Sequence, residues 1–416
     1  MEDPGESDEE SLSDILELVS EHEDESEYES LPDEMRNDFN IESTKEHSYI
    51  FNEDTVEVLN IDTLPENESH LLPYIKINSV IVPGEKLPLS PRCPYSIENL
   101  RRLVQSNDFV VLLFDIRERE YDPHNYTREL DLPCFATVAK ITKHSTISTA
   151  RDPYGQRLVN VELSAIHRCK VFSIERNNRK CGITVLPDIV MPSVMSLTLS
   201  RAELAMSSEK KARLCSSIMN YPKFAIYNMT ENNCETLIKY LSVWFSEGSL
   251  RNILAMGKVP FSFWVTANFT MELSKKYDLL SEDSTDLRLF KLTKYVQKVN
   301  RSICRNCGTS IFKTADIIKM SSEGLGGHYV NPGGTVHNLV TVSTIQEFNY
   351  QGLPSSEYCW FPGYRWQIIV CSRCYAHLGW EYTSDNLKPR KFYGITRTSI
   401  EQVTDMTVDE EDGAQV

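Results

Sequence analysis

The sequence predicts a multidomain α+β protein, in which a β-rich domain with a helical portion precedes a second, all-β domain that a metal ion holds together. Three observations predict this fold class. The acidic residues gather at the two ends, the hydrophobic periodicity changes from strand-like to helical near residue 197 and back near residue 303, and two Cys-x-x-Cys pairs lie in the second β-rich segment. A length of 416 residues agrees with two or three domains of ordinary size.

Residues 1–66 are predicted to form a disordered acidic leader. The first 35 residues hold sixteen Asp and Glu side chains and no Lys or Arg, so charge repulsion and scarce apolar surface oppose folding. Residues 401–416 form a second acidic tail with six acids. Without these ends, 43 basic residues face 38 acidic ones. So small an excess of positive charge argues against direct binding of nucleic acid.

Residues 67–300 form the first predicted domain, and its beginning is β-rich. The apolar run Phe109–Phe114 predicts a strand buried on both faces, and alternation predicts two further strands over Leu158–Leu163 and Ile166–Ile174. One helix is expected over Ser96–Ser106. Many short strands with one inserted helix indicate a small closed or half-closed sheet.

The rest of the first domain shows helical periodicity. A helix that starts near Asn233 and ends near Gly248 is expected, followed by helices from Pro260 and over Thr285–Arg301. The longest apolar run has six residues, and a membrane helix needs about 20, so no membrane insertion is expected. The first residues lack the basic and apolar regions of a secretory signal, and the odd number of eleven cysteines argues against a disulfide framework. A reducing, intracellular compartment is expected.

Residues 301–400 form the second predicted domain, and its strongest signal is a pair of cysteine motifs, Cys304-Arg-Asn-Cys307 and Cys371-Ser-Arg-Cys374. Four thiolates are the ligands that tetrahedral zinc prefers, at a Zn–S distance of about 2.3 Å. Four protein ligands leave no position for water, so one structural zinc is expected rather than a catalytic one. A redox Cys-x-x-Cys motif is the alternative.

Three of the five tryptophans, Trp360, Trp366 and Trp380, lie close together in the second domain. From composition alone, the favoured interpretation is the core of a small sheet. The alternative is an aromatic cage, in which the indole rings enclose a flat or cationic ligand. The sequence contains no phosphate-binding loop, no dinucleotide-binding glycine motif and no His-Glu-x-x-His. Nothing nominates a nucleophile with its base, so a binding protein is favoured over an enzyme.

The segment from Cys304 to Tyr393 resembles the thalidomide-binding (CULT) domain of the cereblon family, an all-β, β-tent-like fold. The resemblance rests on four segments besides the cysteine motifs: Tyr329-Val-Asn-Pro332, Val336-His337, Trp360-Phe-Pro-Gly-Tyr364 and His377-Leu-Gly-Trp380. The β-rich part from about residue 71 resembles the Lon amino-terminal domain that precedes it in that family. That match rests on Val82-Pro-Gly-Glu-Lys-Leu-Pro-Leu89 and Val185-Leu-Pro-Asp-Ile-Val-Met-Pro192.

The resemblance implies a substrate receptor of a cullin-4-type RING E3 ubiquitin ligase, which catalyses nothing itself. Target proteins, including those with C-terminal cyclic imides, would be ubiquitinated and degraded by the proteasome in cytoplasm and nucleus. A β-propeller adaptor of the damage-specific DNA-binding protein type would dock on residues of about 195–255. The resemblance places cyclic-imide small molecules in a cage of six residues, with Tyr358 where members often carry His and Tyr382 where they usually carry Phe: Asn331, Tyr358, Trp360, Trp366, Trp380 and Tyr382. It places zinc on Cys304, Cys307, Cys371 and Cys374.

One alternative function belongs to a different class. Zinc-stapled β folds also serve methionine-sulfoxide reduction, and Cys359 would then be the nucleophile. The missing resolving cysteine outside the zinc set argues against this enzyme.

Overall fold

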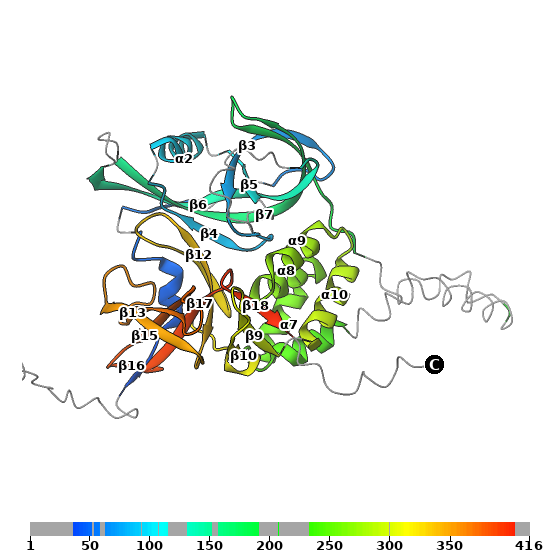
Figure 1. Ribbon diagram of the computed structural model, residues 1–416. Helices are drawn as coiled ribbons and strands as arrows, with labels where there is room; N and C mark the ends of the chain where they lie inside the picture. The colour runs from blue at the N-terminus through cyan, green and yellow to red at the C-terminus, as the bar shows by residue number, and fades with distance from the viewer. Residues whose placement is uncertain are drawn as a thin grey trace, which may run out of the picture.

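The computed structural model describes residues 36–51, 54–58, 63–92, 94–106, 108–114, 131–151, 157–190, 207, 233–298 and 300–403. Figure 1 shows a β-rich domain at the top, a group of helices on the right and a second β-rich domain at the lower left. The predicted α+β fold class is confirmed. Among the described residues, no helix is long and apolar enough to cross a membrane.

The first domain is a closed sheet, as the sequence predicts. Its strands are β2 (Val56–Glu57), β3 (Ser69–Ile77), β4 (Lys86–Leu89), β5 (Val110–Phe114), β6 (Cys134–Arg151), β7 (Arg157–Glu175) and β8 (Lys180–Val185), and α2 (Pro94–Ser106) packs beside them. The order is β2-β6-β5-β3-β8-β7-β4, and β6 also pairs with β7. The strands β6, β5, β3, β8 and β7 therefore form a ring.

Strand β5 lies at the centre of this domain and is buried along its whole length. Val110 and Leu112 enter one hydrophobic cluster and Val111 and Leu113 another, because successive side chains of a strand point to opposite faces. The two strands predicted at 158–163 and 166–174 are one strand, β7. The small residues Ser164 and Ala165 interrupt the alternation but stay paired with β6, so the strand continues.

The helical portion follows, with a helix over 233–241, then α7 (Glu247–Ala255), α8 (Lys258–Asn268), α9 (Leu273–Ser281) and α10 (Thr285–Lys298). The helix expected to reach Gly248 stops at 241, and Ser246 caps a new one by accepting a hydrogen bond from the Ser249 N–H (3.2 Å). Of the segment expected to dock an adaptor, 195–255, residues 195–206 and 208–232 lie outside the described residues.

The second domain has two sheets. The six-stranded sheet has the order β11 (Gly326–Val330), β12 (Val336–Val342), β17 (Lys391–Thr396), β15 (His377–Thr383), β14 (Arg365–Cys371), β13 (Phe348–Ser355). The smaller sheet has the order β10 (Ser310–Lys313), β9 (Arg301–Cys304), β18 (Ile400–Val403). Since β18 pairs with β9 through Val403, residues 401–403 belong to the domain and not to the tail predicted from residue 401.

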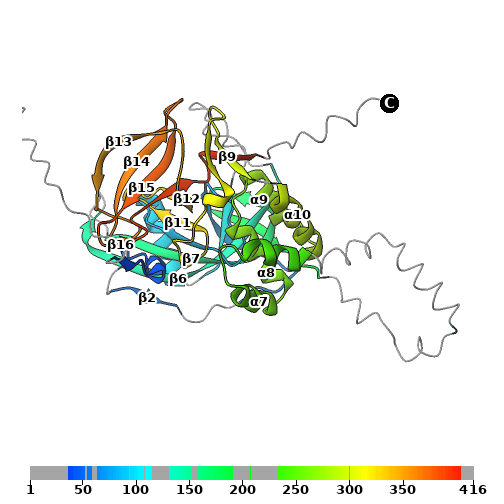
Figure 2. The same cartoon turned by 90° about the horizontal axis from the view of Figure 1, so that it is seen from below.

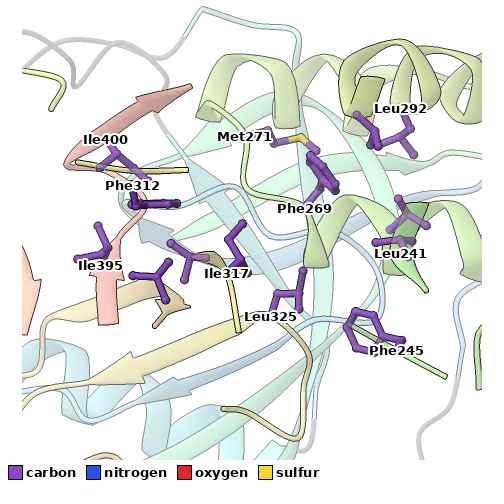
Figure 3. Close-up of a cluster of buried hydrophobic side chains, with 14 of the residues drawn as sticks. Leu241, Phe245, Phe269, Met271, Leu292, Phe312, Ile317, Leu325, Ile395 and Ile400 are labelled. Carbon is purple, nitrogen blue, oxygen red and sulfur yellow. The ribbon is translucent and has the colours of Figure 1, made fainter. Parts of the chain in front are cut away.

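The helices and the second domain share one hydrophobic core. Figure 3 shows Leu241, Phe269 and Leu292 of the helical portion in the same cluster as Phe312 and Ile395 of the second domain. The prediction places these helices in the first domain, residues 67–300. In the structure the helical portion packs on the second domain across the predicted boundary at residue 300.

The acidic leader predicted to end at residue 66 is too long, because the chain is folded from residue 36. Strand β1 (Asn37–Asp38) pairs with β16 (Leu387–Lys388), and a 3-10 helix over Ile41–Glu46 follows. Phe39 packs edge-on against Tyr364, with ring centroids 5.4 Å apart. Figures 1 and 2 show this blue segment alongside the second domain. Its aromatic residues supply the apolar surface that residues 1–35 largely lack.

Candidate metal centre and ligand cavity

Two turns of the second domain bring four cysteines together. Cys304 ends β9 and Cys371 ends β14, and each begins a turn that carries the second cysteine of its motif, Cys307 or Cys374. The two turns have the same geometry: the N–H of the fourth residue after each first cysteine donates to that cysteine's carbonyl, at 2.8 Å for Gly308 and 2.9 Å for Tyr375. Each of these residues has a positive φ, +75° at Gly308 and +58° at Tyr375.

The four sulfur atoms all lie within 4.8 Å of one another. The Sγ–Sγ distance is 3.6 Å both for Cys304 and Cys374 and for Cys307 and Cys371. A tetrahedral metal with bonds of about 2.3 Å separates its sulfur ligands by about 3.8 Å, so the cluster can hold one metal ion. The short distances join the two motifs rather than the two cysteines of one motif, which favours a metal centre over a redox pair.

The surroundings of two of these cysteines shift their pKa values in opposite directions. Hydrogen bonds from the Thr309 side chain and backbone lower the pKa of Cys307 to about 6. Burial raises the pKa of Cys304 to about 12, so a metal must displace that proton. The donor set is therefore one that a thiophilic cation deprotonates on binding.

The six residues predicted to bind a ligand line one cavity of about 430 Å³ beside β14 and β15, here called the cage cavity. Trp366 faces Tyr382 across the paired strands, and Ile368 faces Trp380. The rings of Trp360 and Trp380 meet at 74° with centroids 4.8 Å apart, so they form two perpendicular walls. The full lining is Asn331, Pro332, Glu357, Tyr358, Trp360, Trp366, Ile368, Trp380 and Tyr382.

Hydrogen bonds fix two of the indole rings. The Trp360 Nε1–H donates to the Val330 carbonyl at 3.1 Å, and the Trp366 Nε1–H donates to the Glu357 carbonyl at 2.8 Å. The second bond also holds the loop that carries Tyr358, whose side chain is 60% exposed at a φ of +51°. The cavity therefore has preoriented walls and an exposed rim.

Both interpretations of the aromatic residues hold in part. Tyr382 is buried and stacks on Phe392, with centroids 4.9 Å apart, so it belongs to the core as well as to the cavity lining. Trp360 is also almost completely buried, whereas Trp366 and Trp380 keep part of their surface exposed.

Two histidines whose rings contact Trp380 were not predicted from the sequence to have a role. The ring centroids of His337 and His377 lie 5.0 and 4.7 Å from that of Trp380. Burial lowers the pKa of His337 to about 4, so its imidazole is neutral at neutral pH. The motifs that carry the resemblance contain both residues. Ile368 was missed as well, although alternation from Trp366 along β14 places it on the same face.

Cys359 does not have the environment of a nucleophile. Its thiol donates to the Phe361 carbonyl at 3.2 Å, and burial raises its pKa to about 11. Because the thiolate is the reactive form, this cysteine is inert near neutral pH. The reductase alternative therefore has no support at Cys359.

No family model matches the sequence. Curated relatives named protein cereblon cover most of it. The chicken (Gallus gallus) protein is 28% identical over 402 residues, which is 88% of this chain and 86% of that protein. The Xenopus tropicalis protein is 26% identical, covering 96% and 94%, and the Danio rerio protein 25%, covering 79% of each.

A solved Lon N-terminal domain protein from Xanthomonas campestris aligns with 54% of this chain and 98% of its own, at 12% identity and a TM-score of 0.32. A score this low does not establish a shared fold. The sequence relatives confirm the resemblance to the cereblon family over most of the chain.

Proposed function

We propose that this chain, which resembles cereblon over most of its length, is the substrate-recognition component of a cullin-4-type RING E3 ubiquitin ligase and has no catalytic activity of its own. One observation carries the proposal: the six residues that the resemblance assigns to an imide site line a single cavity. Its ligands are cyclic imides, either as small molecules or at the C-termini of target proteins.

The cage cavity suits a small, flat and nearly uncharged ring. Its volume of about 430 Å³ falls in the usual range for small-molecule sites, about 300–1,000 Å³. Indole walls supply apolar contact on several faces at little ordering cost, since hydrogen bonds already hold Trp360 and Trp366. Asn331 and Tyr358 line the cavity and offer an amide and backbone groups as hydrogen-bond partners, and an imide needs only a few hydrogen bonds.

A single structural zinc ion in the four-cysteine cluster supports this cavity from one side. Cys371 and Trp366 lie on the same strand, β14, and Cys374 lies in the turn that leads to the strand of Trp380. A metal bound there ties β9 of the small sheet to the two strands that carry cage walls. Zinc supplies cross-linking here, not catalysis, because the four thiolates fill its coordination shell.

The helical portion is proposed to dock a β-propeller adaptor of the damage-specific DNA-binding protein type. In the described part of it, Val243 is 74% and Met256 70% exposed. Exposed apolar side chains of this kind suit a protein interface. Target proteins held at the cage cavity would then be ubiquitinated and passed to the proteasome, in cytoplasm and nucleus.

Reconstitution tests this function. The chain is combined with the adaptor, the cullin and its RING partner, and two reporter proteins are compared that differ only in a C-terminal cyclic imide or its ring-opened form. We expect ubiquitination of the cyclic reporter alone, and its loss when free glutarimide is added. Equal modification of the two reporters, or failure of the adaptor to co-purify with the chain, would refute the proposal.

A further inference from the structure

We infer that the first domain carries a basic groove beside the cage cavity, which selects captured proteins with acidic residues just before their C-terminal imide. This inference rests on the proposed function and names its substrate class. The groove consists of two adjoining cavities of about 670 and 480 Å³, which share Tyr74, Ile75, Asn99 and Arg179 in their linings.

The charge of the groove is positive along its length. Lys76, Arg92 and Arg179 line the larger cavity, and no carboxylate is among its described lining residues. In the smaller cavity Arg102 and Lys180 join Arg179 and face a single acid, Asp108. Arg102 pairs with Glu98 at 3.0 Å, so part of its charge is compensated.

The amino-terminal end of α2 adds to this potential. Ser96 and Asn99 of its first turns line the larger cavity, and the first turn holds no acidic residue. The amino-terminal end of a helix carries about half a positive charge from its free N–H groups. A carboxylate in the larger cavity would meet both this end and the three cationic side chains.

One β-turn separates the groove from the cage cavity. Asn331 and Pro332 line the cage cavity, and the next two residues, Gly333 and Gly334, line the groove. The Gly334 N–H donates to the Asn331 carbonyl at 2.9 Å, which closes a four-residue turn. Residues at the two ends of such a turn have Cα atoms less than about 7 Å apart. A peptide spans that distance with two or three residues.

The turn is fitted to the first domain, so the two sites keep a fixed spacing. Gly334 has a φ of +84°, and a Cβ atom there would stand 2.6 Å from the Ser90 carbonyl oxygen. The stem of Arg92 packs against the same glycine. A chain that leaves the cage cavity over this turn therefore meets Arg92 first, and acidic residues about two to five positions before the imide reach the groove.

The test uses the full chain and labelled peptides with a C-terminal glutarimide. Three positions before the glutarimide are all Glu in the first peptide, all Gln in the second and all Lys in the third. Free glutarimide is measured in parallel. We expect the Glu peptide to bind about five- to thirtyfold more tightly than the Gln peptide at low salt, with the preference falling toward twofold at about 0.5 M salt. The double variant Lys76→Glu/Arg92→Glu should reverse the preference and leave the affinity for free glutarimide unchanged.

A matched charge reversal separates a local effect from a change in net charge. Lys239→Glu lies on the exposed face of helix 233–241, which lines neither cavity, and should keep the preference of the parent. Glu and Gln peptides that bind the parent equally, while free glutarimide binds, would refute the groove alone. If the preference for the Glu peptide appeared only after residues 1–35 were deleted, the acidic leader would be the occupant of the groove in the full chain. That result would overturn the inference. Absence of glutarimide binding would overturn the proposed function and the groove with it.

Discussion

Lys276 and Glu85 form a buried ion pair that joins α9 to the loop before β4. The Lys276 ammonium lies 2.7 and 2.8 Å from the two carboxylate oxygens, and the Val82 N–H also donates to Glu85 at 2.7 Å. Burial opposes the charge on Glu85, but Lys276, His328 and these hydrogen bonds outweigh it and hold the pKa of Glu85 below its usual value. The pair links the helical portion to the first domain.

Breaking this pair should be costly. Glu85→Ala leaves a buried ammonium without its counter-charge, and the expected loss is about 3–5 kcal/mol in the free energy of unfolding. Removing both charges with Glu85→Gln and Lys276→Met should restore at least half of that loss, because no unpaired charge remains. Urea denaturation measures both values. A loss below about 1 kcal/mol for Glu85→Ala would show that water reaches the pair.

Glu323 should make stability depend on pH. Burial, opposed by Lys86 at 4.0 Å, raises the pKa of this carboxyl from 4.5 to about 7. A raised carboxyl pKa gives stability that is fully present below about pH 4.5 and is lost as the pH rises through 7. The side chain keeps 25% exposure, so we expect a loss of only about 1 kcal/mol. In Glu323→Gln, the melting temperature should depend less on pH between pH 5 and 8 than it does in the parent. A pH dependence equal to that of the parent would contradict this assignment.

Loss of one cysteine of the metal centre should unfold more than the second domain. A structural zinc site contributes about 10–16 kcal/mol of apparent binding free energy, which exceeds the stability of most domains, about 5–15 kcal/mol. Cys371→Ser should therefore lose the metal and also loosen residues 233–298, since both share the core in Figure 3. Cys359→Ser, outside the cluster, should keep one zinc per chain.

Elemental analysis and hydrogen exchange measure these effects. If the metal were lost while the amides of α8 and α10 kept their protection, the helical portion would be stable without the second domain. If the parent held less than one zinc per chain in its folded form, the metal assignment itself would fail.

Truncation should separate the leader from the folded segment that follows it. Deletion of residues 1–35 should leave the melting temperature nearly unchanged, because these residues hold little apolar surface. Deletion through residue 51 also removes Phe39, which packs on Tyr364, and Tyr49, whose hydroxyl accepts from the Val330 N–H at 3.3 Å. We expect a further loss of about 2–3 kcal/mol, as for one buried aromatic side chain. Phe39→Ala in the full chain should reproduce part of that loss, and calorimetry showing equal stability for the two truncations would refute the docking.

The parts of the fold that local pattern determines could be predicted. Many short strands with one inserted helix predicted a closed or half-closed sheet, and the preference of zinc for four thiolates predicted that the two cysteine motifs meet. Trp366 and Trp380 lie on two strands that are consecutive in the chain and paired in the sheet, so their closeness follows from their positions in the sequence.

What the sequence could not supply is the choice of distant partner. Phe39 docks on aromatic residues more than 300 positions later, and no local pattern encodes that contact. The helical stripe of α10 shows that Leu289 and Leu292 are buried, but not that they share a core with the second domain. Lys76, Arg92 and Arg179 gather only in the folded chain, so composition, which is nearly neutral over residues 36–400, hides the basic groove.

Replacement of Trp366 by alanine tests whether the aromatic residues bind a ligand or only form a core. A small imide gains affinity from contact on several faces in a dry site, and Trp366→Ala removes one wall together with its hydrogen bond to Glu357. At about 25 cal/mol per Å² of apolar area, losing roughly 80–120 Å² of contact costs about 2–3 kcal/mol, a thirty- to hundredfold weakening. Calorimetry with glutarimide measures it.

Three variants make this measurement decisive. Trp366→Phe keeps an aromatic wall and should weaken binding far less than Trp366→Ala. Tyr358→His changes a rim residue that is 60% exposed and should also have a small effect. Tyr350→Ala removes an exposed ring on the neighbouring strand, outside the cage cavity, and should have none. All of them should retain zinc, because the four cysteines are untouched. If Trp366→Ala binds glutarimide as tightly as the parent, the tryptophans form only a core and the imide does not bind in the cage cavity.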